Sequence, residues 1–280
     1  MKVSFWGVRG STPVSGADFV RYGGSTSCVT VSHDDDDLPR LVLDAGTGLV
    51  NLARRFGADA FHGTILLTHM HWDHMQGLPF FWAADREAAV VDLRLPVGEG
   101  ALDAEHILGG VMQPPFFPIG PRGLRGTWSF AAVDTEPFEA EGFRITAHDV
   151  PHKGGRTVGY RITDGTSTIS YAPDHRPTAF GPGDDGFGEF HPAALALATD
   201  VDVLVHGGPY RAQELKIADD FGHTTIPYAI GLAIRAGATR LVITHHSPIR
   251  TDAQLDELGE MAAGGDVPVE FAFEGLVVAA

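Results

Sequence analysis

The sequence predicts an α/β protein in which short strands alternate with helices along the chain. Short apolar runs rich in β-branched residues, such as residues 28–32 and 143–149, are typical of buried strands. Segments with helical spacing of apolar residues, such as residues 226–236, separate these runs. A histidine or aspartate also follows several predicted strands, as expected where an α/β sheet carries a site at its strand ends.

In the first half of the chain, residues 63–67 form a β-branched apolar run that is typical of a buried strand. Residues 44–48 follow another strand and lead into a helix. Residues 113–121 form a stiff loop rich in proline and phenylalanine, which is either a packed connection or a wall of a substrate pocket. We expect strands at residues 1–7, 28–32, 40–43 and 63–67, and helices at residues 49–56, 76–84 and 101–108.

The second half continues the alternation. The segment 226–236 has Thr225 at the N-cap position, Pro227 in its first turn and Gly237 at its end, which are helix start and stop signals. No composition break or linker divides the chain, so we expect a single domain over residues 1–280 with two similar halves. Strands are expected at residues 129–133, 143–149, 157–163, 167–172, 201–205 and 240–244, and helices at residues 192–198, 226–236 and 252–262.

The composition suits a soluble globular protein, with 44% hydrophobic and 20% charged residues. Cys28 is the single cysteine, which excludes an internal disulfide and a cysteine-based metal site. The chain shows no signal-peptide pattern, so we expect a cytoplasmic protein. No apolar run approaches the roughly 20 residues that span a bilayer, so no membrane association is expected.

The charge balance bears on the class of partner. The chain has 20 Lys+Arg against 36 Asp+Glu, a net charge of −16. A long nucleic acid requires a basic surface, so we expect no such partner. A small anionic substrate remains compatible with this balance, because bound metal ions supply positive charge locally.

The most informative segment is THMHWDH at residues 68–74. On an extended backbone, the i, i+2 spacing of His69 and His71 puts both side chains on one side. Asp73 and His74 follow where the chain must turn, so they reach a second point in space. This pattern after a predicted strand indicates metal binding rather than a polar loop that formed by chance.

Two metal ions need more than four protein ligands. Further ligands are expected where later strands end, by analogy with the first set. A residue of this kind at one strand end is usually a capping or surface residue, whereas several such strand ends together favour a metal site. The candidates are His152, Asp174, His206, His245 and His246.

These segments resemble the metallo-β-lactamase-fold hydrolases over nearly the whole chain. The histidine run is specific for that superfamily, and other segments point to the branch that contains ribonuclease Z and bacterial cyclic phosphodiesterases. The latter segments are residues 7–11, 22–28, 44–48, 114–118, 159–162, 171–175, 222–224 and 245–248. The resemblance implies a four-layer αββα sandwich of two mixed sheets flanked by helices, and it alone suggests a homodimer.

The resemblance also implies a site for two divalent ions, with zinc favoured and manganese or iron as alternatives. His245 is preferred to His246 because Thr244-His245 matches the Thr-His pair of the family. Asp44 is expected to orient a liganding imidazole, and a helix N-cap is a compatible role. The other supporting residues are His175, His206 and His246. The implied ligands are His69, His71 and His152 for one ion, Asp73, His74 and His245 for the other, and Asp174 as the bridge.

The implied chemistry is attack on phosphorus by a metal-bridging hydroxide at the centre that Asp73 and Asp174 help to form. His223 matches a Gly-His-Ser/Thr motif and would protonate the leaving oxygen, although capping or packing is an alternative role. It precedes helix 226–236, whose amino end would favour a phosphate.

One position departs from the family pattern. Relatives have an acidic residue that orients the catalytic histidine at the position of Gly207. His223 would therefore lack its usual partner unless Glu214, Asp219 or Asp220 replaces it.

Three functions follow from these expectations. The first is a metal-dependent phosphodiesterase that acts on a small or cyclic phosphodiester. The second is an esterase, thioesterase or lactonase on the same metal centre, because a good leaving group reduces the need for an acid. The third is a non-catalytic metal-binding module, which Gly207 also favours.

Overall fold

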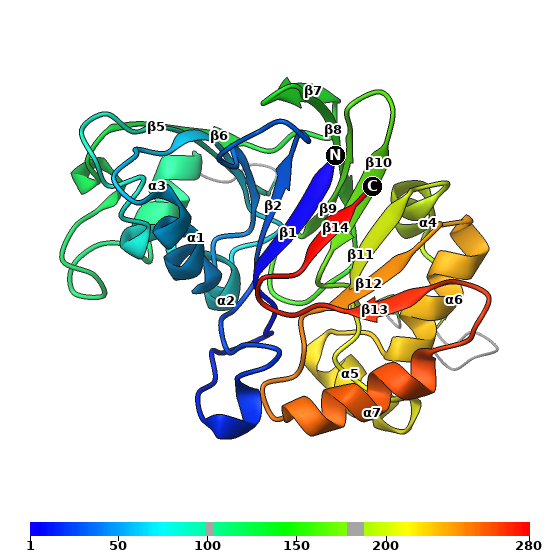
Figure 1. Ribbon diagram of the computed structural model, residues 1–280. Coiled ribbons are helices and arrows are strands. Elements are labelled where there is room, and N and C mark those ends of the chain that lie inside the picture. The colour runs from blue at the N-terminus through cyan, green and yellow to red at the C-terminus, as the bar shows by residue number, and fades with distance from the viewer. Residues whose placement is uncertain (99–102, 178–187) are drawn as a thin grey trace.

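The computed structural model describes residues 1–98, 103–177 and 188–280. Two β-sheets pack face to face, and helices cover the outer face of each sheet (Figure 1). This arrangement confirms the predicted four-layer αββα sandwich. The core between the sheets includes Val3, Phe5 and Val31 from one sheet and Ile145, Tyr160 and Val205 from the other.

Each sheet has seven strands, and the pairing changes from antiparallel to parallel along it. The first sheet has the order β14-β1-β2-β3-β4-β5-β6 and is parallel from β3 onwards. Its strands are β14 (Val277–Ala279), β1 (Lys2–Gly7), β2 (Cys28–Ser32), β3 (Leu41–Leu43), β4 (His62–Leu66), β5 (Val90–Leu95) and β6 (Thr127–Ala132).

The second sheet has the order β13-β12-β11-β10-β9-β8-β7 and is parallel from β13 to β10. The two sheets therefore share one pattern of pairing. Strands of the second sheet are β13 (Val269–Phe271), β12 (Leu241–Thr244), β11 (Val203–Gly207), β10 (Thr168–Ala172), β9 (Val158–Thr163), β8 (Phe143–Asp149) and β7 (Phe138–Ala140).

The helices bury their apolar faces against the sheets. In α6, Thr225 occupies the N-cap position without a capping hydrogen bond from its side chain, and Gly237 ends the helix with a φ of 71°. Within the described ranges, no helix has the length and apolar character needed to cross a membrane. The helices are α1 (Gly48–Phe56), α2 (Trp72–Met75), α3 (Ala104–Gly109), α4 (Pro192–Ala198), α5 (Leu215–Phe221), α6 (Ile226–Ala236) and α7 (Asp252–Ala262).

The helix predicted over residues 76–84 is wrong. The helical turn α2 comes earlier, and a 3-10 helix at Leu78–Phe80 follows a break at Gly77. A Cβ atom at Gly77 would lie 2.0 Å from the carbonyl oxygen of Gly46, so the chain passes very close to that loop. The N–H of Gly77 donates to the carbonyl of Ala45, and Pro79 has no N–H, so no regular helix continues here.

The sequence prediction also missed several elements. β5 carries Asp92 and Arg94 between its buried positions, and these charges mask its apolar character. β7, β13 and β14 are three residues long, too short to show a period. The helix α5 was missed, and residues 101–102 of the helix predicted over 101–108 lie outside the described residues. β11 extends to Gly207, so His206 lies within this strand rather than after it.

Candidate metal centre

The side chains of the histidine run lie beyond the carboxyl end of β4. His69 and His71 belong to the segment between β4 and α2, and His71 is extended, with φ −70° and ψ 151°. α2 begins directly after His71, so Asp73 and His74 lie in its single turn. This change of backbone conformation directs the two pairs of side chains to different points.

Three imidazoles form the first donor cluster, which consists of His69, His71 and His152. Nδ1 of His71 lies 2.9 Å from Nε2 of His69 and 3.4 Å from Nε2 of His152. Nδ1 of His152 donates to the carbonyl oxygen of Gly222 over 2.6 Å. Because a carbonyl oxygen only accepts, Nδ1 carries the proton and Nε2 presents a lone pair to the cluster.

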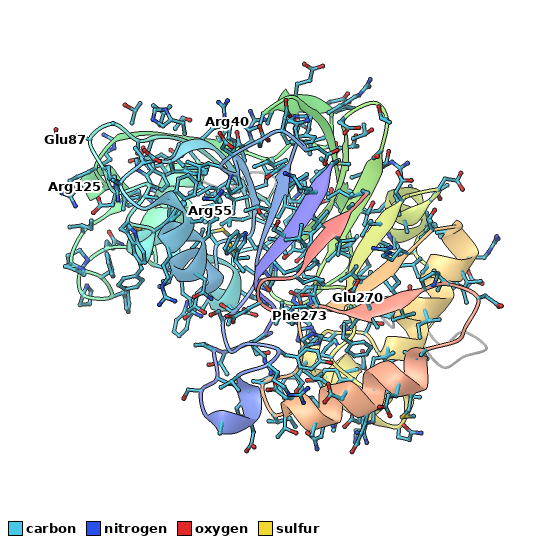
Figure 2. The ribbon with its side chains drawn as sticks, viewed as in Figure 1. Arg40, Arg55, Glu87, Arg125, Glu270 and Phe273 are labelled. Carbon is cyan, nitrogen blue, oxygen red and sulfur yellow. The ribbon has the colours of Figure 1, made fainter. Side chains whose placement is uncertain are left out.

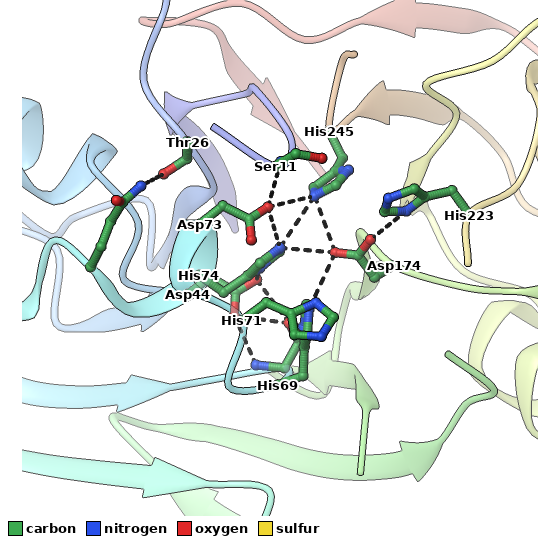
Figure 3. Close-up of polar contacts among 12 residues, drawn as sticks. Ser11, Thr26, Asp44, His69, His71, Asp73, His74, Asp174, His223 and His245 are labelled. Carbon is green, nitrogen blue, oxygen red and sulfur yellow. Dashed lines mark hydrogen bonds and ion pairs between the residues drawn. The ribbon is translucent and has the colours of Figure 1, made fainter. Parts of the chain in front are cut away.

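Asp73, His74 and His245 form the second donor cluster. Nε2 of His74 lies 3.2 Å from Nε2 of His245, and Oδ2 of Asp73 lies 3.3 Å and 3.1 Å from these two nitrogens (Figure 3). Nδ1 of His74 donates to Oδ2 of Asp44 over 2.8 Å. Nε2 is therefore the ring nitrogen of His74 that faces the cluster.

Asp174 lies between the two clusters, beyond the end of β10 (Figure 3). Its Oδ2 is 3.8 Å from Nε2 of His69 and 2.9 Å from Nε2 of His74, so one carboxylate contacts both clusters. This is the position that a bridging carboxylate would take. Further neighbours of Asp174 are Nε2 of His245 at 3.2 Å, Nε2 of His152 at 4.0 Å and Nδ1 of His223 at 2.8 Å.

The donor set fits divalent metal ions. Nε2 of His152 lies 3.4 Å from Nδ1 of His71, and Nε2 of His74 lies 3.2 Å from Nε2 of His245. Nitrogen lone pairs this close repel each other unless a proton or a metal cation lies between them. Both carboxylate oxygens of Asp174 are buried without a hydrogen bond of regular geometry. Imidazole nitrogens and carboxylate oxygens are established zinc ligands, so the clusters are consistent with a metal site.

The charges of the site agree with this fit. Burial raises the pKa of Asp174, but the imidazoles of His245 and His152 outweigh burial and hold the pKa well below its ordinary value. Burial lowers the pKa of His74, but Asp73 and Asp44 outweigh it and raise the pKa well above its ordinary value. These carboxylates favour a positive charge at His74, and a metal ion would supply that charge in place of the proton on Nε2. Burial lowers the pKa of His152 to about 4, so that its ring stays neutral near pH 7 and keeps a lone pair for a metal.

Asp44 connects the end of β4 to the second cluster. In addition to His74, it accepts the N–H of Thr68 at 2.7 Å and the O–H of Tyr171 at 2.9 Å. A carboxylate fixed in this way orients the ring of His74. The N-cap role that was also expected for Asp44 is wrong, because Thr47 is the N-cap of α1. The sequence prediction missed Thr68 and Tyr171, although both lie in segments that carry the family resemblance.

Ser11 is a further residue that the sequence prediction missed. Its N–H donates to Oδ2 of Asp73 over 2.6 Å. Ser11 and His245 both adopt positive φ, 64° and 58°, a conformation that costs about 1 kcal/mol or more for residues other than glycine. A Cβ atom at Gly10 would lie 2.3 Å from the ring of His245, so the segment at residues 7–11 packs tightly against the cluster.

His246, His175 and His206 lie outside the donor clusters. Nε2 of His246 donates to the carbonyl of Ala272 over 2.8 Å, so His245 and not His246 reaches the second cluster. Nδ1 of His206 donates to the carbonyl of Gly207 over 2.7 Å, and Nε2 of His206 lies 3.4 Å from Nδ1 of His175. Burial lowers the pKa of His206 to about 4 and that of His246 to about 3, so both rings pack in the neutral form near pH 7.

His223 lies at the mouth of the site, where it lines a pocket of about 430 Å³ together with Ser11, Trp72 and Phe221. Nδ1 of His223 lies 2.8 Å from Oδ1 of Asp174, the residue between the clusters. Among the residues expected to replace the missing acid, Glu214 pairs with Arg250 and Asp219 pairs with Arg176. For Asp220, the backbone carbonyl accepts from the side chain of Lys153.

The packing of neighbouring backbone explains why residue 207 is a glycine. A Cβ atom at this position would lie 1.9 Å from the carbonyl oxygen of Pro173. The backbone of β11 thus passes too close to the segment after β10 for any side chain at this position. An acid cannot stand at residue 207 in this arrangement of the two strands.

Residues 39–246 match the beta-lactamase superfamily domain. The chain belongs to the metallo-β-lactamase superfamily. The ribonuclease Z of Haloarcula marismortui is 24% identical to this superfamily member, and the alignment covers 100% of this chain and 94% of that protein. This distant homology confirms the predicted branch.

Two solved structures show the same fold as this superfamily member. The metallo-β-lactamase-fold protein YhfI from Bacillus subtilis matches with a TM-score of 0.72 and 18% identity over 99% of both chains. Zinc-bound PqqB from Methylobacterium extorquens matches with a TM-score of 0.70 and 18% identity over 100% of both chains. At this identity, the likeness concerns the fold alone.

Proposed function

We propose that this superfamily member is a metal-dependent hydrolase that cleaves a small or cyclic phosphodiester. The observation that supports this function best is the position of Asp174 between two three-residue donor clusters, with His223 directly beside it. The homology to ribonuclease Z supports attack on phosphorus, because a ribonuclease cleaves phosphodiester bonds.

The ligand roles follow the clusters. His69, His71 and His152 would hold one divalent ion, and Asp73, His74 and His245 the other, with Asp174 shared between them. Zinc suits these donors best, and the zinc-bound PqqB supports this choice, while manganese and iron remain alternatives. When bound, such ions polarise a phosphoryl oxygen and make water a nucleophile near neutral pH.

His223 supplies the proton for the leaving group. The contact of its Nδ1 with Asp174 fixes the orientation of the ring. The other ring nitrogen, Nε2, is then available to a substrate oxygen in the pocket that His223 lines. Asp174 thereby orients the ring of His223, as the acidic residue at the position of Gly207 does in relatives.

The substrate is small rather than a nucleic acid polymer. The pocket at the clusters has a volume of about 430 Å³, which suits one small molecule. Arg40, Arg55 and Arg125, which Figure 2 labels, lie apart from one another. Arg40 pairs with Glu141 and Arg125 pairs with Asp85, which reduces their attraction for phosphates. With a net charge of −16, no extended basic surface is expected.

Hydrolysis of a carboxylic ester, thioester or lactone is the second candidate. The close contact of Gly207 with Pro173 supports it, because the family acid is excluded from this position. A substrate with a good leaving group depends less on an acid that protonates the leaving oxygen.

Rates on two chromogenic substrates separate the candidates. We expect the protein to hydrolyse bis(p-nitrophenyl) phosphate with a higher kcat/KM than p-nitrophenyl acetate. Asp174→Ala should abolish the phosphodiesterase activity, whereas Asp256→Ala, a carboxylate paired with Arg21 at the surface, should keep it. Faster turnover of the acetate by metal-loaded protein would favour the second candidate, and metal binding without turnover of either would favour a non-catalytic module.

A further inference from the structure

We propose that an apolar groove beside the metal centre binds an alkyl or aryl group of the substrate. This inference rests on the proposed function and narrows its substrate class to phosphodiesters with one large apolar ester group. The groove has a volume of about 460 Å³, and its position relative to the donor clusters is set by α2.

The floor of the groove is a buried apolar surface. Met75, Leu78, Leu108 and Met112 line it, and each is exposed by 6% or less. The rim is apolar as well, because Phe80, Val111 and Phe116 are 56%, 40% and 75% exposed. Exposed aromatic side chains gathered around a hollow indicate a binding surface rather than scattered surface residues.

Trp72 joins the groove to the metal centre. Its side chain lines both the groove and the pocket with His71, Asp73 and His223. On a helical turn, residues i, i+3 and i+4 share a face, so Trp72 faces the groove together with Met75 and Gln76. Asp73 and His74 of the same turn belong to the second donor cluster. One turn of helix therefore separates a place for a charged group from a place for an apolar group.

The loop at residues 113–121 completes the groove. Phe116 and Phe117 line it, and the rings of Phe117 and Phe80 meet edge to face with centroids 5.9 Å apart. The sequence allowed this loop to be a packed connection or a pocket wall, and the structure places its aromatic residues in a wall. The groove is thus built from two segments, residues 72–80 and 108–117, that meet beside the clusters.

The chemistry of the lining selects the occupant. Among the described residues, the lining includes no charged side chain, and Gln76 is the polar one. A nucleotide base would leave most of its hydrogen-bonding groups unpaired there, whereas an alkyl chain or aryl ring needs no such partners. Each methylene that the groove buries fully raises affinity about fourfold.

Calorimetry with two non-hydrolysable ligands tests the groove without turnover. Methylphosphonate and octylphosphonate share the anionic head that suits the metal centre. A difference between their affinities for the metal-loaded protein is therefore due to the longer alkyl chain of octylphosphonate. We expect octylphosphonate to bind about 100-fold more tightly or better. Equal affinities would overturn the inference. Octylphosphonate binding that is unchanged after removal of the metals would also overturn it, because head and chain would then not bind together.

Matched variants test whether the octyl chain of the ligand lies in the groove. Val111→Asp places a charge at the rim and should remove most of the preference for octylphosphonate. Val277→Asp, at a 56% exposed position of β14, should leave the preference unchanged. Phe116→Ala provides a second rim variant that adds no charge and should weaken octylphosphonate alone. Equal losses in Val111→Asp and Val277→Asp would contradict binding in the groove.

Turnover separates this inference from the proposed function. Methyl p-nitrophenyl phosphate and octyl p-nitrophenyl phosphate have the same leaving group. A higher kcat/KM for the octyl ester supports both proposals. Turnover of both esters at equal kcat/KM keeps the phosphodiesterase and overturns the groove, whereas no turnover of either ester overturns the phosphodiesterase on which the inference depends.

Discussion

Nδ1 of His223 lies 2.8 Å from Oδ1 of Asp174, the carboxylate whose other oxygen contacts both donor clusters. The residue that would donate a proton and the residue that would bridge two metals thus form one unit. In the proposed function, Asp174 would replace the acid that is excluded from position 207. The proposed activity therefore does not require a carboxylate at Gly207.

Replacement of His223 tests its role as a proton donor. In His223→Gln, turnover of phenyl phosphodiesters should fall about 100-fold or more, because the leaving oxygen then departs without a proton. A p-nitrophenyl leaving group should be affected less. The metal content of His223→Gln, measured by elemental analysis, should stay unchanged. In the exposed control His62→Gln, neither the turnover nor the metal content should change. Loss of metal from His223→Gln would instead make this residue a ligand.

Asp44→Asn tests how the second cluster is held. The amide keeps the shape of the carboxylate but removes the negative charge that accepts the Nδ1–H of His74. We expect metal affinity to fall about 10- to 100-fold in a competition titration with a chelator. Asp85→Asn, which alters an ion pair with Arg125 at the surface, is the matched control. Unchanged affinity in Asp44→Asn would refute its orienting role.

Gly207→Ala tests the close approach of β11 to Pro173. A single methyl group there meets a carbonyl oxygen, so the free energy of unfolding should fall by about 1–3 kcal/mol. Gly265→Ala is the control, because a Cβ atom at that position meets no atom within 4 Å. Equal urea midpoints for the two variants would show that residue 207 has room for a side chain.

The residue patterns predicted an α/β alternation, and the family resemblance implied the four layers. The donor residues were predicted better than the local helices and strands. His69, His71, Asp73 and His74 stand out because a run of ligand side chains is rare in any loop. The groove floor did not, because Leu108 and Met112 are apolar residues like those of any core. The false helix at residues 76–84 arose because a contact with Gly46 interrupts an otherwise helical pattern, and such contacts between distant segments leave no local signal.

The pH dependence of stability follows from buried neutral histidines. Burial lowers the folded-state pKa of His206 to about 4, whereas an unfolded histidine has a pKa of about 6.5. As the pH falls from about 6.5 to about 4, His206 binds a proton in the unfolded chain but stays neutral in the folded chain. The free energy of unfolding therefore decreases over this range. Urea unfolding across this range should show a weaker decrease in His206→Gln than in His106→Gln, an exposed control. Equal slopes would contradict the shifted pKa of His206.

The metal content of the purified, active protein tests the central claim most directly. Elemental analysis should find about two divalent ions per chain, as the two donor clusters around Asp174 require. Asp73→Ala should lower this number, because it removes a donor of the second cluster, while Asp256→Ala should not. Phosphodiesterase activity from protein that holds no metal would contradict the account.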